Sequence, residues 1–458
     1  MSVTAIILAA GEGTRMKSNH AKVSHEVLGK PMINWVVDAA RAGGCDRVVV
    51  VVGSHAEEVE SLVANIDGVS CVTQAERLGT GHAVKIALEA AHINEGPVVV
   101  LNGDLPLIEN STISKFAASV TDGFAAAVLT MTPPNVDGYG RIEFNNRGDV
   151  ARIIEQKDCT DLQAQMLRDC NAGCYAFDGE KLAQHIEELS CDNAQHEYYL
   201  TDMIEIMRNA HERVTAFHCD DYKEGLGVNS RIQLAQLTAI ARDKVNERHM
   251  ASGVTMLDPT SVYIGPDVEI ERDTVILPQT MLWGKTSIGE GCIIGPNTRL
   301  SNTHVGSFSL VDETVAIDTT IDNHVTCGPR AYLRPGTHLC DGSKAGTHVE
   351  IKNSTIGVGS KVPHLSYIGD TQMGEGVNVG AGSITCNYDG VHKNPTTIGN
   401  HTFIGSDTMM VAPVNIGDNA VTGAGGTITK DVPAGALALE RSQQINIEGY
   451  SDRKASKH

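Results

Sequence analysis

Positive charge, paired cysteines and long apolar segments are all scarce in this sequence. The chain has 36 lysines and arginines against 56 aspartates and glutamates, which gives a formal net charge of −20. This surplus of negative charge repels nucleic acid and acidic membrane surfaces, so we expect neither as a partner. The apolar start at residues 4–10 and the other hydrophobic runs are too short to cross a bilayer, so we expect no membrane insertion.

The 11 cysteines are an odd number and include no Cys-x-x-Cys pair. Cys170 and Cys174 are close in sequence, but no cluster of His or Cys completes a zinc pattern around them. We therefore expect reduced cysteines in small core positions and a cytoplasmic protein. A length of 458 residues favours two domains.

The second half is abundant in one regular feature, an aliphatic residue that returns every six positions between Val262 and about Asp431. This period predicts a left-handed parallel β-helix of hexapeptide repeats, in which three hexads form one triangular coil and the aliphatic side chain points inward. The alternative, a β-sandwich, would alternate at period two without a fixed repeat. The predicted inward residues are Ile264, Ile270, Ile276, Leu282, Ile288, Ile294 and Leu300, then Val305, Val311 and Ile317, then Ile321, Cys327, Leu333, Leu339, Ala345 and Ile351, then Ile356, Val362, Ile368, Met373 and Val379, and after an interruption Ile398, Ile404, Met410, Ile416 and Ile428, with Thr422 off the pattern.

Two cations follow inward residues one coil apart. Arg334 follows Leu333 and Lys352 follows Ile351, so we expect them side by side on the outer surface, roughly 4.8 Å apart along the prism. Adjacent cations repel each other, so one interpretation is a bound anion such as a sugar phosphate. The other interpretation is two solvated surface cations. Tyr367 is expected on the same face.

His364 lies two residues after an inward valine, at a corner of the predicted prism. A corner position favours an exposed imidazole over a buried core histidine. An exposed imidazole can act as a general base toward an ammonium substrate. The interruption between Val379 and Ile398 contains a polar segment at residues 385–394. A loop that leaves a regular prism is a candidate site element.

The first half alternates strand-like and helical runs. Residues 5–10, 48–52 and 98–101 are predicted strands, and residues 31–43 and 81–92 are predicted helices. This pattern predicts an α/β domain with a Rossmann-like, mostly parallel sheet. Ligands of such sheets lie at the carboxyl ends of the strands.

Two loops follow these predicted strands. Residues 8–16 form a glycine-rich turn that departs from the dinucleotide fingerprint and the P-loop, but its backbone N–H groups suit phosphate oxygens, and Arg15 and Lys22 bring cations near. The second loop carries Asp104, whose carboxylate suits Mg²⁺. From this loop alone, a helix-capping role for Asp104 is an equal alternative.

The first half carries a series of short motifs in a fixed order: Leu8–Met16, Lys22 with His25, Leu78–Ala83, Gly103–Leu107, Gly138–Ile142, Glu155–Lys157, Asn171–Gly173, Glu197–Asp202 and Gly227–Arg231. Taken in this order, the motifs resemble those of the sugar-nucleotide pyrophosphorylases, a family of nucleotidyltransferases. A pyrophosphorylase followed by a hexapeptide prism resembles, along essentially the whole chain, the GlmU family of bifunctional N-acetylglucosamine-1-phosphate uridyltransferases and glucosamine-1-phosphate acetyltransferases, which make a precursor of peptidoglycan and lipopolysaccharide.

The resemblance implies roles in the first half. Asp104 and Asn229 would hold Mg²⁺, and Arg15 and Lys22 would be the catalytic cations that stabilise charge on the phosphates of UTP. The remaining nucleotide and sugar contacts would come from Leu8, Ala9, Ala10, Gly11, Gln74, Gly79, Thr80, Asn102, Gly103, Gly140, Glu155 and Asn171.

In the second half the resemblance implies a homotrimer whose acetyltransferase sites are completed by neighbouring subunits. His364 would be the catalytic base. Glucosamine phosphate would be bound by Arg334, Lys352, Tyr367 and Asn378. Acetyl-CoA would be bound by Ala381, Asn387, Tyr388, Ser406, Ala424 and Arg441, with Lys393 nearby.

Three positions depart from the family pattern. Arg77 stands where Gln is common, Asn102 stands where Tyr is common beside the metal aspartate, and Ala21 precedes Lys22 in place of Pro. Because the first two lie near the nucleotide, the resemblance predicts the reaction type rather than the base preference.

The predicted domains are residues 1–230, the pyrophosphorylase, and 253–458, the acetyltransferase, with a linker helix at 231–252. A helix packed wholly within the first domain is the alternative for this linker. Two other functions stay open. One is a pyrophosphorylase with a regulatory or structural prism, which His364 and the two cations speak against. The other is an inactive trimeric scaffold, which catalytic residue types in both halves speak against.

Overall fold

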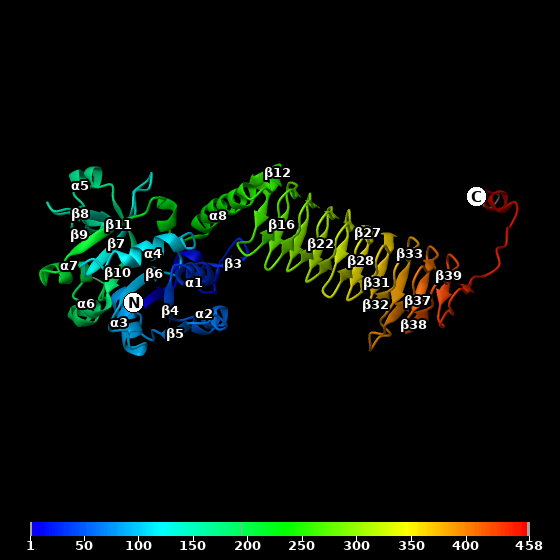
Figure 1. Cartoon of the computed structure of the whole chain (residues 1–458), viewed down its shortest axis with the longest axis horizontal. Coiled ribbons are helices and arrows are strands. Elements are labelled where there is room, and N and C mark those ends of the chain that lie inside the picture. The colour runs from blue at the N-terminus through cyan, green and yellow to red at the C-terminus, as the bar shows by residue number, and fades with distance from the viewer. Residues whose placement is uncertain (1, 194, 456–458) are drawn as a thin grey trace. The chain divides into compact units, whose positions relative to one another are not determined.

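A computed structural model describes residues 2–193 and 195–455 of the chain, which form two compact units, Met1–Ala241 and Arg242–His458 (Figure 1). Met1, Ala194 and residues 456–458, which the predicted domain ranges include, lie outside the described residues. Among the helices that the structure describes, none combines the length and hydrophobicity needed to cross a bilayer.

The first unit is built on a mixed sheet. Its strand order is β11-β7-β10-β6-β1-β4-β5, and the pairs β6–β1, β1–β4, β4–β5 and β7–β11 are parallel, whereas β10 runs antiparallel to both neighbours. An antiparallel hairpin of β8 and β9 joins the edge of β10. The bounds are β1 (Val3–Leu8), β4 (Cys45–Val52), β5 (Val69–Thr73), β6 (Pro97–Asn102), β7 (Ala126–Met131), β8 (Arg141–Phe144), β9 (Val150–Ile154), β10 (Cys170–Asp178) and β11 (Val214–His218), with a small separate pair of β2 (Glu26–Val27) and β3 (Lys30–Pro31).

Helices cover both faces of this sheet because alternate residues of each strand point to opposite sides. In β1, Ile7 packs with side chains of α1 and α4, whereas Ile6 packs with side chains of α3 and α7. The α/β prediction is confirmed, and the helices of this unit that pack on the sheet or its edges are α1 (Met32–Ala42), α2 (Ala56–Val63), α3 (Thr80–Ala90), α4 (Asn110–Ala118), α6 (Gly179–His185) and α7 (Asp202–Asn209), whereas α5 (Asp161–Met166) buries no side chain.

The chain order makes a crevice at the end of β1. After β1 the chain adds β4 and β5 on one side of it and then places β6 on the other side. The connections therefore leave β1 in opposite directions, and the carboxyl ends of β1 and β6 flank the point where open α/β sheets bind ligands.

The second unit is a prism of three parallel sheets, as the six-residue period predicts. We name each face after one strand. The β30 face contains β12 (Thr255–Met256), β15 (Val275–Ile276), β18 (Ile293–Ile294), β21 (Leu310–Val311), β24 (Thr326–Cys327), β27 (Lys344–Thr347), β30 (Lys361–His364), β33 (Asn378–Val379), β36 (Phe403–Ile404), β39 (Val421–Thr422) and β41 (Leu437–Ala438). The β28 face contains β13 (Tyr263–Ile264), β16 (Met281–Trp283), β19 (Arg299–Ser301), β22 (Val315–Ile317), β25 (Tyr332–Leu333), β28 (Glu350–Lys352), β31 (Tyr367–Gly369), β34 (Ile384–Cys386), β37 (Met409–Val411) and β40 (Thr427–Ile428). The β26 face contains β14 (Glu269–Ile270), β17 (Ser287–Ile288), β20 (His304–Val305), β23 (Thr320–Ile321), β26 (His338–Leu339), β29 (Thr355–Ile356), β32 (Thr371–Met373), β35 (Thr396–Ile398) and β38 (Val414–Ile416).

The predicted inward residues are buried, with one error in the count. Leu300 pairs with Ala316, which is buried, so Ile317 is not an inward residue and the prediction there is wrong. Thr385 and Thr422 occupy core positions as polar side chains. The Thr385 hydroxyl accepts from the backbone N–H of Gly369 at 2.7 Å, and the Thr422 hydroxyl accepts from that of Gly405 at 2.9 Å. A backbone partner makes burial of a threonine hydroxyl tolerable.

The interruption of the repeat therefore begins after Thr385. Residues 387–395 leave the prism as a loop, which projects from the orange part of the chain in Figure 1. An antiparallel bridge between Tyr388 and Lys393 closes the loop.

The boundary between the two units falls within α8 (Arg231–Ala251). In the second unit, its C-terminal half packs on the first coil of the prism through Val245, Asn246 and His249, all buried. The Asn246 amide donates to the carbonyls of Pro259 at 2.8 Å and Val262 at 3.0 Å. This half of α8 shields the end of the apolar prism core that would otherwise face water. A short helix, α9 (Tyr450–Ala455), lies near the C-terminus.

Candidate active sites

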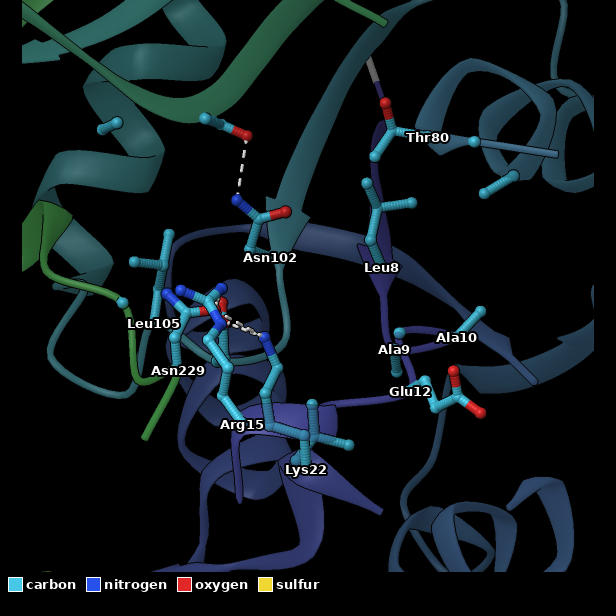
Figure 2. A pocket seen from close by; sticks show the side chains of 18 of the residues that line it. Leu8, Ala9, Ala10, Glu12, Arg15, Lys22, Thr80, Asn102, Leu105 and Asn229 are labelled. Atoms are coloured by element: carbon cyan, nitrogen blue, oxygen red, sulfur yellow. Dashed lines mark hydrogen bonds and ion pairs between the residues drawn. The ribbon is translucent and has the colours of Figure 1, made fainter. Parts of the chain in front are cut away.

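A cavity of about 1170 Å³ opens at the carboxyl ends of β1 and β6 in the first unit (Figure 2). It occupies the crevice that the strand order predicts. The predicted residues that line it are Leu8, Ala9, Ala10, Gly11, Arg15, Lys22, Gln74, Gly79, Thr80, Asn102, Asp104, Asn171 and Asn229.

The glycine-rich turn brings Lys22 into this cavity. Gly13 has a φ of +61°, and a Cβ added to it would lie 2.7 Å from the Cβ of Lys22. A larger residue at position 13 would therefore be strained and would push Lys22 away. Two short 3₁₀ turns, Thr14–Met16 and Lys22–Ser24, carry Arg15 and Lys22, which both line the cavity.

Four polar side chains meet at the end of β6 (Figure 2). The Lys22 ammonium forms an ion pair with Asp104 and donates to Asn229 Oδ1 at 3.3 Å. Arg15 Nη2 donates to the same oxygen at 3.0 Å. The backbone carbonyl of Asp104 accepts from Val228 at 3.1 Å, which ties the Asn229 loop to the end of β6. The residue that precedes α4 is Glu109, so the helix-capping interpretation of Asp104 is wrong.

These residues fit a divalent metal ion. The Asp104 carboxylate and the Asn229 amide oxygen converge on one cationic nitrogen, so their negative ends already face a common point. Carboxylate and amide oxygens are hard ligands of the kind that Mg²⁺ prefers, and Mg²⁺ completes its shell with water and substrate phosphates.

At the opposite end of the cavity, Gln74 is buried and its amide is fixed. Its Nε2 lies 3.1 Å from the Gly79 carbonyl and 3.1 Å from His82 Nδ1. Gly79 has a φ of +105°, and a Cβ on it would lie 2.5 Å from the Tyr198 carbonyl, so only glycine fits. The Thr80 hydroxyl accepts from Leu200 N–H at 3.1 Å, which anchors the start of α3.

A third group of residues surrounds β10. Asn102 Nδ2 donates to the Gly173 carbonyl at 3.1 Å, and Asn171 Nδ2 donates to the Tyr175 hydroxyl at 2.8 Å. Three predicted residues lie beside the cavity rather than in its lining. The Gly140 carbonyl accepts from Asn171 at 2.9 Å with Glu155 next to Gly140, and Gly103 N–H donates to the Leu8 carbonyl at 3.0 Å.

The sequence analysis did not single out every residue that lines the cavity. Among the missed residues, Glu12, Tyr139, Glu197, Tyr199 and Gly227 belong to motifs already quoted, so the signal was present but no role was assigned. Glu12 was missed although it pairs with Arg77, at 3.2 Å between Oε2 and Nη1. The missed lining residues include Glu12, Asp137, Tyr139, Glu197, Tyr199, Gly227 and Gln233.

On the prism, Leu333 pairs with Ile351, so Arg334, which directly follows β25, and Lys352, at the end of β28, lie one coil apart as predicted. However, each cation has its own carboxylate. Arg334 Nη1 lies 2.9 Å from Glu350 Oε1, and Lys352 Nζ lies 3.8 Å from Asp370 Oδ2. The Glu350 contact raises the pKa of Arg334. The predicted repulsion between this pair is therefore offset by acidic partners, and it does not by itself require a bound anion.

The close pair of cations is instead Lys352 and Lys393, the latter from the projecting loop. Contact with Lys352 lowers the pKa of Lys393. Burial opposes ionisation of Asp370, but hydrogen bonds from Asn353 and Asn387 and the charge of Lys352 outweigh it and lower the Asp370 pKa. The Asn387 amide joins this cluster at 2.5 Å from Asp370 Oδ2 and 3.5 Å from the Tyr367 hydroxyl. Lys352, Lys393 and Asp370 thus form one cluster of two cations and a carboxylate at the end of β28.

His364 is exposed where β30 turns toward β31. It lies at the edge between the β30 and β28 faces, whereas Lys352 and Asp370 lie at the other edge of the β28 face. The predicted base and the predicted phosphate-binding cations therefore flank the β28 face from its two sides. Asn378 is apart from them, on the β30 face beside Lys361.

Three predicted acetyl-CoA ligands form a row along the edge that carries His364. The Ala381 carbonyl accepts from Asp407 at 2.7 Å, and the Ser406 carbonyl accepts from Gly425 at 2.9 Å, which stacks these corners coil on coil. Arg441 Nη1 donates to the Ala424 carbonyl at 3.4 Å. Asn387 and the exposed Tyr388 lie on the other edge, so one chain does not unite the whole predicted set.

Comparison with known families agrees with this division. A model described as a MobA-like NTP transferase domain matches residues 5–196. Models of the bacterial transferase hexapeptide (six repeats) and of the hexapeptide repeat of succinyl-transferase match residues 267–302 and 395–430.

Relatives with the name bifunctional protein GlmU are similar along nearly the whole chain. The protein of Streptomyces avermitilis is 47% identical over 453 residues, which cover 98% of this chain and 94% of the relative. The protein of Brevibacillus brevis is 44% identical over 456 residues, which cover 99% of this chain and 98% of the relative. The protein of Caldanaerobacter subterraneus subsp. tengcongensis is 46% identical over 456 residues, with 99% of both chains covered.

Proposed function

The chain belongs to the GlmU family of bifunctional transferases, and we propose that it catalyses two successive steps of UDP-N-acetylglucosamine synthesis. The prism would acetylate glucosamine-1-phosphate with acetyl-CoA, and the first unit would then transfer uridylate from UTP to the product. The observation that carries this proposal is the separation of two chemically different sets of residues, a cation and carboxylate cluster in the first unit and a histidine with cations on the prism.

For uridylyl transfer, a phosphate oxygen of N-acetylglucosamine-1-phosphate attacks the α-phosphorus of UTP. A new P–O bond forms, the bond between the α-phosphorus and its bridging oxygen breaks, and pyrophosphate leaves with that oxygen. Arg15 and Lys22 would neutralise the charge that develops on the phosphates, and Gln74 and Thr80 would hold the base. Positioning and charge stabilisation suffice for this reaction, so a protein nucleophile is not required.

Asp104 and Asn229 would hold Mg²⁺, which when bound screens the phosphate charge and helps to orient the triphosphate. The position between their oxygens is taken by the Lys22 ammonium in the structure. Lys22 would therefore keep the two oxygens together and move toward the phosphates when the ion and the nucleotide are present.

For acetyl transfer, the substrate amine reaches the enzyme mainly as an ammonium, which lacks a free electron pair. His364 would accept one proton of the ammonium, and the amine nitrogen would then attack the thioester carbonyl carbon. As the C–S bond breaks, the second proton lost from the nitrogen would pass to the thiolate, which leaves as coenzyme A. Arg334, Lys352 and Tyr367 on the β28 face would bind the sugar phosphate, with Lys393 supplying a further positive charge. The corners at Ala381, Ser406 and Ala424 would contact acetyl-CoA together with Arg441.

We further propose that the prism forms a homotrimer in which neighbouring chains complete this site. Support comes from the division of the predicted acetyl-CoA ligands between two edges of one prism. Exposed apolar side chains also gather on the β30 face, where burial against another copy would be favourable. They are Ile293, Leu310, Phe403, Val421 and Leu437. A cytoplasmic location is supported by the 11 cysteines, all of which are free thiols.

The test is an assay of the purified protein with glucosamine-1-phosphate, acetyl-CoA, UTP and Mg²⁺, with released coenzyme A and pyrophosphate measured separately. We expect coenzyme A release without UTP, and pyrophosphate release only after acetylation or when N-acetylglucosamine-1-phosphate is supplied. Pyrophosphate release without any acetyl transfer would instead support a pyrophosphorylase with a structural prism.

A further inference from the structure

Three side chains with metal-binding atoms lie together on the β26 face, outside both candidate active sites. Asp322 directly follows β23, and His338 and Cys340 flank the inward Leu339 of β26. Among residues 2–193 and 195–455, they are the one group of three or more His, Cys, Asp or Glu side chains whose ligand atoms all lie within 4.8 Å of one another. We propose that Asp322, His338 and Cys340 form a zinc-binding site on the outside of the prism.

The geometry favours a metal over a hydrogen-bonded relay. Asp322 Oδ2 lies 2.8 Å from His338 Nε2, and Cys340 Sγ lies 4.0 Å from the same nitrogen. In a Cys–His–Asp relay, one ring nitrogen contacts the cysteine and the other contacts the aspartate. Here Asp322 and Cys340 both face Nε2 of His338. Zinc bonds of about 2.0–2.3 Å hold tetrahedral ligand atoms roughly 3.3–3.8 Å apart, which small side-chain rotations reach from this arrangement.

The backbone holds the three residues in place. Asp322 N–H donates to the Leu339 carbonyl at 2.8 Å, and the N–H groups of His338 and Cys340 each donate to the next coil at 2.9 Å. Ligands on rigid strands need little reorganisation to bind an ion. Asp322 and Cys340 occupy equivalent positions in successive coils. The equivalent position is Gly306 in the coil before and Gly357 in the coil after, so neither neighbouring residue has a side chain that covers the cluster.

The chemistry of the donors selects the ion. An imidazole nitrogen and a thiol favour zinc over Mg²⁺ or Ca²⁺, which take oxygen ligands. Burial raises the pKa of Cys340, and the nearby carboxylates of Asp322 and Asp341 raise it further. A divalent cation reverses both effects, because it pairs with the thiolate and neutralises the carboxylate. Water would take the fourth position.

The site is accessible to solvent because the side chains of Asp322, His338 and Cys340 are all partly exposed. The outward residues of the β26-face strands are Glu269, Ser287, His304, Thr320, His338, Thr355, Gln372, Thr397 and Asn415. The strands of this face lack the exposed apolar side chains of the β30 face, which is the face proposed above to pack against other copies. The proposed site does not depend on either transferase activity.

Full-length protein stripped of metal by a chelator provides the test. Excess Mg²⁺ is added first to occupy the Asp104 region, and Zn²⁺ is then titrated by calorimetry while Co²⁺ is titrated by near-ultraviolet absorbance. The variants are Cys340→Ser and Asp322→Asn. Cys386→Ser, which removes another partly buried thiol of the same prism, is the matched control.

We expect one Zn²⁺ per chain and a thiolate-to-cobalt charge-transfer band in the parent protein and in Cys386→Ser. Cys340→Ser should lose the band and weaken zinc binding at least about tenfold, and Asp322→Asn should weaken binding but keep the band. Circular dichroism checks that each variant is folded. Absence of the band in the parent protein, or an unchanged band and zinc affinity in Cys340→Ser, would overturn the proposal.

Discussion

At the scale of single residues, His364 is the side chain whose removal should affect acetyl transfer most selectively. His364→Ala should reduce acetyl transfer roughly 10²-fold or more, because the ammonium of the substrate then loses its proton acceptor. Uridylyl transfer from supplied N-acetylglucosamine-1-phosphate should be unchanged. Separate steady-state assays of the two reactions measure this difference. A variant that acetylates at the parent rate would exclude His364 as the base.

Arg334→Ala should act on binding rather than on the chemical step. It should raise KM for glucosamine-1-phosphate with little change in kcat, since the substrate phosphate is already anionic before the reaction. The structure adds a second reason, because the Glu350 carboxylate that pairs with Arg334 would then face the phosphate without compensation. The control is Arg330→Ala, which breaks a comparable pair with Glu313 on the same prism. Equal KM values for both variants would contradict the assignment.

Arg77 departs from the family pattern and lines the cavity of the first unit, where its partner is the exposed carboxylate of Glu12. The Arg77–Glu12 pair is largely exposed, and such pairs contribute about 0–1 kcal/mol. Arg77→Gln should therefore change kcat/KM for UTP by less than about fivefold. Kinetics with UTP and with the other nucleoside triphosphates measure this effect. A larger loss specific to UTP would show that Arg77 contacts the base.

At the scale of secondary-structure elements, the C-terminal half of α8 carries a titratable group against the prism. His249 is buried and its Nε2 is without a hydrogen-bond partner among the described residues. Burial, with a smaller contribution from Arg248, lowers the pKa of His249 from its ordinary value of 6.5 to about 4. Between these two pH values the unfolded chain binds a proton that the folded chain does not.

The prism should therefore lose stability as pH falls from about 6.5 to about 4, by at most about 3 kcal/mol from this residue, and little more below that window. His249→Leu should flatten the pH dependence in the same window. Urea unfolding in a Trp35→Phe background, in which Trp283 is the remaining tryptophan of the chain, reports on the prism. The same pH dependence in both proteins would rule out His249 as its source.

The repeat was predictable because one rule, an aliphatic residue at every inward position, is imposed by stacking of the coils. The inward position was misassigned where several neighbouring residues satisfy this rule equally well. Val315, Ala316 and Ile317 are all apolar, so the sequence does not show which of them pairs with Leu300. Thr385 and Thr422 were also misjudged, because burial of a hydroxyl depends on a backbone donor in another coil.

At the scale of the whole molecule, residues carried by family motifs were easier to place, even from distant segments, than side-chain pairs between neighbouring coils of the prism. The convergence of Arg15, Lys22, Asp104 and Asn229 follows from the carboxyl ends of neighbouring strands and from the family motifs. By contrast, the Arg334–Glu350 and Lys352–Asp370 pairs depend on side-chain directions that a repeat count does not supply. The position of Lys393 beside Lys352 depends on how the projecting loop folds back.

The central claim is that one chain holds two separable active sites, and the most direct measurement is the pair of activities of Asp104→Ala. The carboxylate of Asp104 lies in the first unit, where it meets Lys22 and would hold Mg²⁺. We predict that this variant releases no pyrophosphate from UTP and N-acetylglucosamine-1-phosphate, but releases coenzyme A from acetyl-CoA and glucosamine-1-phosphate at close to the parent rate. Loss of both activities in a folded protein of unchanged oligomeric state would contradict the claim.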